Sequence, residues 1–220
     1  MAFRRAADNG QSAVDLAATE IRQRIRSGEF VPGQRLVAAE LGALLEMSIG
    51  PIREALTRLA GEGLVEVQQY RGAIVRSQSP EDLIEIYQVR EVIEGLAARL
   101  AARAVRDGKR SSKPLQKIAD RGRKHAQAFE LLAYLQANQE LHEMIYSMAG
   151  TPRVTALART LSDQIDRLNN RHLAQAWVLQ RSADEHQAIV DAITAGDEGR
   201  AETLMRSHVS SMGSKISGRS

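Results

Sequence analysis

The sequence predicts a mainly α-helical protein, with a small mixed domain at the N-terminus and an antiparallel six-helix bundle at the C-terminus. Apolar residues recur at three- and four-residue spacing along most of the chain, which is the pattern of amphipathic helices. Two short β-prone runs near residue 70 interrupt that pattern, and after Ser79-Pro80 almost everything is helical again. We therefore expect a disordered lead-in at 1–11, a first domain at 12–78 and a second at 79–216.

Bulk composition limits the classes of function. A chain of 220 residues is long enough for two small domains, and 43% hydrophobic with 26% charged residues is ordinary for a globular protein. We expect no membrane span and no secretory signal, since no long apolar run is present. Cysteine is absent, which removes disulfide and thiolate chemistry and fits a cytoplasmic location. The formal net charge of +3 permits a polyanionic partner without requiring one.

The first domain is expected to hold three helices and a hairpin. Gly28 can adopt the left-handed conformation that ends the first helix, and Ser48 is a suitable N-cap for the third. In the second helix we expect Leu41, Leu44 and Leu45 to face the core. The expected elements are helices at 12–27, about 37–46 and about 48–60, and strands at 64–67 and 73–75.

Three helices followed by a hairpin is the layout of a winged helix-turn-helix. The third helix offers its N-terminal turn to a DNA groove, and Arg71 at the hairpin tip can reach the flanking backbone or minor groove. Every basic residue before position 109 is arginine, which is suited to guanine edges and phosphates. We favour DNA contact for Arg53, which lies on the third helix beside the turn. The other arginines could equally be solvated surface charges: Arg4, Arg5, Arg22 and Arg24.

A dense set of family motifs lies between residues 25 and 75. They are Ser27-Gly28, Pro32-Gly33, Leu36, Ser48, Pro51, Arg53-Glu54-Ala55-Leu56, Leu59, Glu62-Gly63-Leu64 and Arg71-Gly72. With these residues the run resembles the DNA-binding domain of the GntR family of regulators. The resemblance implies a DNA-binding dimer that reads a short palindrome in double-stranded DNA. The residues that it implies as DNA contacts are Arg35, Ser48, Arg53, Arg71 and Gly72.

Two positions depart from the family pattern at the turn. After the serine the family commonly has an arginine and then a small polar residue, whereas this chain has Ile49 and Gly50. Ile49 cannot read a guanine, although it could pack on a thymine methyl group. We therefore keep both residues in the expected DNA-binding surface and expect an operator that differs from the usual one.

The second domain is expected to be an antiparallel bundle, which can enclose a polar cavity between facing helices. Its first helix carries an apolar stripe at Leu83, Ile86, Val89, Ile93, Leu96 and Leu100. Tyr134 and Trp177 are expected in the core. The six helices are expected at about 80–107, 114–127, 130–149, 152–178, 183–195 and 197–216.

Histidines are the informative residues of this domain. His142, His186 and His208 lie on three different predicted helices, and Asn138 lies one turn before His142 on the same face. On pattern alone, scattered histidines are more often surface or hydrogen-bonded residues than metal ligands. The segments 141–150, 185–197 and 205–208, however, resemble the FCD ligand-binding domain of the FadR-like GntR subfamily. That resemblance implies a divalent metal bound by Asn138, His142, His186 and His208 at the base of an effector pocket.

Asn138 stands where the subfamily usually has aspartate. Asparagine can ligate through its carbonyl oxygen but brings no negative charge. An ion held by three histidines and an asparagine keeps its full positive charge, which favours a small carboxylate effector. We expect zinc, with nickel or manganese as alternatives, or else a pocket that has lost its metal and binds its effector by hydrogen bonds.

Further candidates for effector binding lie on the first and fourth predicted helices of the bundle. Arg90 could bind a carboxylate in bidentate fashion. It could instead pair with Glu94 one turn along the same helix, or contribute to the dimer interface. Arg167 and Asn170 could line the same cavity.

These features together predict a ligand-responsive DNA-binding repressor that works as a homodimer and is not an enzyme. One alternative is a constitutive DNA-binding dimer whose helical domain is only structural. A remote alternative is a metal-dependent hydrolase or lyase, because three histidines can form a catalytic zinc site. Against it, no glutamate neighbours the histidines at a recognised catalytic spacing, and Glu143 and Glu185 are expected on adjacent helix faces.

Overall fold

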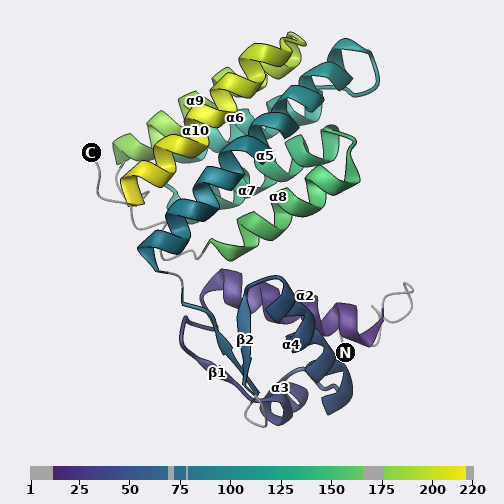
Figure 1. Ribbon diagram of the computed structural model, residues 1–220. Coiled ribbons are helices and arrows are strands. Elements are labelled where there is room, and N and C mark those ends of the chain that lie inside the picture. Colours follow the sequence, from purple (N-terminus) through teal and green to yellow (C-terminus); the bar gives the residue numbers. More distant parts are fainter. Residues whose placement is uncertain (1–11, 69–71, 78, 166–175, 217–220) are drawn as a thin grey trace. The chain divides into compact units, whose positions relative to one another are not determined.

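The computed structural model describes residues 12–68, 72–77, 79–165 and 176–216. Within these ranges the chain is mainly α-helical, as predicted, and it divides into two compact units between residues 78 and 79 (Figure 1). The disordered lead-in expected at 1–11 lies outside the described residues.

The N-terminal unit combines three helices with a small antiparallel sheet. A capping box formed by Ser12 and Asp15 starts the first helix, and Gly28 ends it with a φ of 76°. These local signals explain why the predicted and observed ends of that helix agree. The elements are α2 (Ala13–Ser27), β1 (Arg35–Leu36), α3 (Ala38–Leu44), α4 (Ile49–Gly61), β2 (Val65–Gln68) and β3 (Gly72–Val75).

The sheet has the strand order β1-β3-β2, and both pairings are antiparallel. The β2–β3 hairpin was expected, but β1 was missed because two residues are too few to display an alternating pattern. Gly72 has a φ of 89°, and a Cβ atom there would lie 2.4 Å from the carbonyl oxygen of Leu36. Only glycine therefore lets β3 pass β1 so closely at this end of the sheet.

The core of the N-terminal unit is formed by one face of each helix together with the sheet. Ile21 of α2, Leu41 of α3 and Ile52 of α4 are all buried. One expectation was wrong, because Leu44 is 51% exposed while Leu45 is buried. α3 is only seven residues long and ends at Leu44, so it offers the core a narrower face than a longer helix would.

The C-terminal unit contains six helices within its described residues. A capping box formed by Ser79 and Asp82, with Pro80 in the first turn, starts the longest of them. None of the described helices combines the length and the hydropathy that crossing a bilayer requires. The helices are α5 (Pro80–Arg106), α6 (Lys113–Gln127), α7 (Leu131–Met148), α8 (Pro152–Gln164), α9 (Ala176–Thr194) and α10 (Glu198–Ile216).

α10 packs along α5 in the antiparallel direction (Figure 1). A Cβ atom on Gly213 would touch Tyr87, and one on Gly95 would touch Arg206, so a larger residue at either crossing would displace a side chain of the other helix. α6 packs against α7 and α9, while α8 packs against α5. The face of α5 that these helices cover is rich in alanine, which allows the close approach: Ala97, Ala98, Ala101 and Ala102.

The prediction for residues 152–195 was wrong about where the helices break. α8 ends at Gln164, because Ile165 adopts an extended backbone conformation, and α9 already includes Ala176. The sequence between Arg153 and Ala195 contains neither glycine nor proline, so no local signal marks the break. Trp177, on the first turn of α9, is 57% exposed instead of lying in the core, while Tyr134 is buried as expected.

The apolar stripe of α5 also departs from expectation at one position. Val89 is 49% exposed, although Leu83 of the same predicted stripe is buried. In this chain the neighbouring helices cover only part of the stripe.

Candidate DNA-binding surface and histidine centre

Four of the residues expected to contact DNA line one groove of the N-terminal unit. Arg35 of β1, Ile49 and Arg53 of α4, and Gly72 of β3 share this groove, which has a volume of about 490 Å³. Ile49 and Val67, which both line it, are 44% and 49% exposed. The groove therefore offers arginine side chains beside exposed aliphatic surface, which is a suitable combination for base edges that carry both acceptors and methyl groups.

The N-terminus of α4 is the other exposed feature of this surface. Ser48 occupies the N-cap position with an extended backbone, as predicted, but its side chain makes no capping hydrogen bond. The first backbone N–H groups of a helix have no partner within the helix and favour an anion such as a phosphate. A Cβ atom on Gly50 would meet nothing within 4 Å, so glycine leaves this end open. Arg71, at the tip of the wing, lies outside the described residues.

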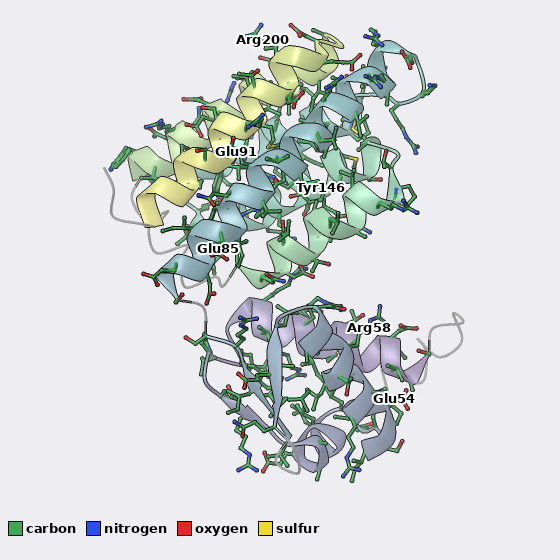
Figure 2. The ribbon with its side chains drawn as sticks, in the orientation of Figure 1. Glu54, Arg58, Glu85, Glu91, Tyr146 and Arg200 are labelled. Atoms are coloured by element: carbon green, nitrogen blue, oxygen red, sulfur yellow. The ribbon has the colours of Figure 1, made fainter. Side chains whose placement is uncertain are left out.

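Most other arginines of this unit are held in ion pairs. Arg22 of α2 pairs with Glu62 at 2.7 Å, and Arg24 bonds to Glu20 and Glu29. Arg58 of α4, which is labelled in Figure 2, pairs with Asp15 at 2.5 Å. These contacts favour the structural interpretation that the sequence left open for Arg22 and Arg24. Arg53 is exposed, and among the described residues its side chain forms no ion pair.

In the C-terminal unit the three predicted histidines come together. His142 of α7, His186 of α9 and His208 of α10 are all buried, and each offers a ring nitrogen within 4.8 Å of the others. The Nε2 atoms of His186 and His208 are 3.1 Å apart. Three helices far apart in sequence therefore place three imidazoles around one centre.

Two glutamates contact the outward-facing Nδ1 atoms of two of these histidines, and the sequence analysis predicted neither contact. The Nδ1 atom of His142 lies 2.7 Å from Glu94 of α5, and that of His208 lies 2.8 Å from Glu185 of α9. Glu185, which precedes His186 on α9, bridges to His208 on the neighbouring helix α10. Such carboxylate–histidine contacts typically orient metal-binding imidazoles. Sequence spacing could not reveal them, because each pair joins two different helices.

Glu94 is the centre of a buried network. Its side chain is fully buried and accepts from the Nε of Arg90 at 2.5 Å, the intrahelical pair considered as an alternative for that arginine. The Arg90 guanidinium also lies 5.1 Å from the ring centre of Tyr87. Burial acts to raise the pKa of Glu94, but the charges of Arg90 and His142 outweigh it and hold that pKa well below its usual value. Tyr146, labelled in Figure 2, is buried, and its ring contacts that of His142.

The ionised glutamates determine which nitrogens of the histidines carry hydrogen. Burial acts to raise the pKa of Glu185, but the hydrogen bond from His208 and the charge of that ring lower it overall. A carboxylate without a proton can only accept, so Nδ1 of His142 and of His208 must donate. In the neutral rings Nε2 then carries the lone pair. The network thus turns the Nε2 lone pairs of both rings towards the shared centre.

Burial also favours the neutral form of two of the three histidines. Desolvation, followed by the charges of His208 and His142, holds the pKa of His186 well below its ordinary value. Burial likewise lowers the pKa of His208, and the hydrogen bond to Glu185 offsets only part of that effect. Neutral imidazole is the form that binds metal ions. Three buried imidazoles around one centre, two of them oriented by carboxylates, therefore fit a divalent cation of the type that histidine binds.

The remaining predicted site residues lie as follows. Asn138 is half-buried on α7 and lines a small cavity together with His186. Arg167 and Asn170 lie outside the described residues.

Comparisons with known proteins agree with both units. Residues 14–75 match the bacterial regulatory proteins of the gntR family, and residues 85–211 match the FCD domain family. The HTH-type transcriptional repressor GlaR of Escherichia coli (strain K12) is 28% identical over 200 residues, covering 86% of this chain and 89% of the relative. The HTH-type transcriptional regulator LutR of Bacillus subtilis (strain 168) is 26% identical over 223 residues, covering 88% and 96%.

The solved structure of E. coli McbR/YncC has a TM-score of 0.80 to this chain at 19% identity, covering 94% of this chain and 97% of that one. At that identity the likeness concerns the fold. The family matches over most of the chain determine its class: it belongs to the GntR family of bacterial regulatory proteins, carries an FCD domain, and is a ligand-responsive DNA-binding transcriptional regulator and not an enzyme.

Proposed function

We propose that this regulator is a repressor that binds a palindromic operator as a homodimer and responds to a small carboxylate bound beside a zinc ion in the FCD domain. The single observation that carries the sensing part is the cluster of three buried histidines with ring nitrogens within 4.8 Å of one another. Burying three imidazoles around one centre is costly unless their inward-facing nitrogens find a partner, and one bound cation would serve all three. The constitutive dimer offers no reason for such a cluster.

The DNA-binding part of the proposal rests on the groove beside α4. Arg53 and Arg35 would contact guanine edges or phosphates, Ile49 would pack on a thymine methyl group, and the Ser48 end of α4 would face a phosphate. Gly72 and Arg71 would bring the wing to the flanking backbone. In a homodimer, two copies of this surface would read two half-sites related by two-fold symmetry.

The metal part of the proposal assigns His142, His186 and His208 as protein ligands, with Asn138 as an additional oxygen donor. Three histidines with an open position suit zinc, and nickel or manganese are the alternatives. A bound divalent ion would supply a positive charge and a coordination position for one carboxylate oxygen. Asn138 adds no negative charge, so an anionic effector would be favoured over a neutral one.

An operator selection tests this function. Duplexes that bind the wild-type protein would be selected from a random pool, and affinity for the winning sequence would then be measured with and without small carboxylic acids. We expect a palindromic consensus, and an effective acid should weaken binding about 5- to 150-fold, which corresponds to a coupling of about 1–3 kcal/mol. If no acid in a broad panel changes operator affinity, a small carboxylate is not the effector.

Glu185 offers a test of the proposed metal centre with a graded series of variants. E185A removes the acceptor for the Nδ1–H of His208, whereas E185Q keeps an uncharged acceptor. We expect E185A to bind zinc about 10- to 100-fold more weakly than the wild type, with E185Q in between. Competition with a chromogenic chelator measures the affinity, and ¹⁵N chemical shifts of the histidine rings report the tautomer of His208.

The neighbouring substitution D184N is the matched control, since it removes a carboxylate next in sequence that makes no contact with the histidines in the described structure. E185A protein that binds zinc as tightly as D184N protein would contradict the orienting role of Glu185.

A further inference from the structure

A buried arginine donor without a partner lies beside the histidine centre. Arg123 is on α6, and its Nε atom is buried and has no hydrogen-bond partner among the described residues. Leaving a buried donor of a charged group unpaired costs several times the value of an ordinary hydrogen bond. Native structures keep such groups mainly where a water, an ion or a ligand completes the pairing.

The cavity next to Arg123 indicates that an oxygen atom of a small anion could be the missing hydrogen-bond partner. Arg123, Asn138 and His186 line a space of about 10 Å³ between α6, α7 and α9. No carboxylate side chain lines it, so none of the residues that line the cavity offers the Arg123 guanidinium an opposite charge. The space is about one water in size, which is enough for one oxygen atom of an anionic head group. Small neighbours such as Ala119 and Gly122 leave this room.

Arg90, the arginine that the sequence singled out for effector binding, is engaged elsewhere. Its guanidinium bonds to the fully buried Glu94 and lies over the ring of Tyr87. Withdrawing it would leave the Glu94 carboxylate buried without its cation, which costs several kcal/mol. Arg123 has no such commitment to a described residue.

We propose that Arg123 is the anion anchor of the effector site: its guanidinium binds a carboxylate oxygen of the ligand in the cavity that it shares with Asn138 and His186. This inference rests on the proposed sensing function and adds to it the residue that selects for an acid. An arginine presents several N–H donors in one plane, which suits a carboxylate better than a neutral ligand. A neutral oxygen could accept from the Nε–H group, but only an anion also pairs with the charge of the guanidinium.

The test measures binding of acetate, lactate and succinate to zinc-loaded full-length protein by the shift in its thermal midpoint. We expect the acid that binds the wild type best to bind R123Q about 10- to 100-fold more weakly, because a charge-assisted hydrogen bond is lost. R123K keeps the positive charge but lacks the planar pair of N–H donors, so its affinity for the acid should lie between those of the wild type and R123Q. K124Q removes one positive charge from the exposed neighbouring residue and should behave as the wild type does.

The outcomes separate this inference from the proposal on which it depends. Competition with a chelator measures the zinc affinity of the same variants, and we expect R123Q to bind zinc as tightly as the wild type. If the wild type itself does not bind zinc, that result contradicts the proposed metal centre but not the role of Arg123. Equal acid binding by R123Q and K124Q would overturn the anchor. So would a wild type that binds none of the three acids and shows only an ordered water on Arg123 in a crystal structure.

Discussion

The variant H186A is expected to bind zinc at least a hundredfold more weakly than the wild type. Structural zinc sites contribute about 10–16 kcal/mol through about four ligands, so each ligand carries roughly 3 kcal/mol. His186 is the most deeply buried histidine of the cluster, at 4% exposed, and its Nε2 lies only 3.1 Å from that of His208. Removing it leaves two imidazoles, which cannot hold the ion as tightly.

Metal content of tag-free protein and chelator competition measure this effect. H125A is the matched control, because His125 of α6 bonds to Glu130 at the surface, outside the cluster. We expect that variant to retain wild-type zinc affinity. Zinc should also raise the thermal midpoint of the wild type. A free zinc concentration of a hundred times the dissociation constant adds about 2.7 kcal/mol to the free energy of unfolding. Equal zinc affinity in H186A and the wild type would remove the metal centre from the proposal.

Replacing Arg53 with alanine is expected to weaken operator binding about 5- to 150-fold. The loss of one arginine that contacts a base edge costs about 1–3 kcal/mol and relaxes the preference at that position. Arg53 is exposed on α4 and lines the groove with Ile49, so no structural contact in the described chain needs it. Titration of the selected operator by fluorescence anisotropy, at two salt concentrations, measures both affinity and its salt dependence.

Arg58 provides the control within the same helix. It pairs with Asp15 and Glu62 and is not among the residues that line the groove. We expect R58A to keep operator affinity within about twofold, the range of an exposed charge that makes no phosphate contact. If R53A and R58A reduce affinity equally, the effect is general electrostatics, and the groove is not the surface that reads DNA.

The sequence by itself determined much of the local structure. Ser12 and Ser79 start helices with capping boxes, and Gly28 ends one in the left-handed conformation. These features depend on residues within one turn of each other, so they can be predicted from neighbouring residues alone. The motifs around Arg53 and the three histidines likewise indicated the class of regulator before any packing was known.

Only the tertiary structure decided which side chains act together. The contacts of Glu94 with His142 and of Glu185 with His208 join different helices, and the partnerless Nε of Arg123 is apparent only once α6, α7 and α9 are packed. The end of α8 at Gln164 is another such case, since no glycine or proline marks it. Hydrophobic period and capping residues specify a helix and its ends, but the rotation of one helix against another depends on the packing of the whole core.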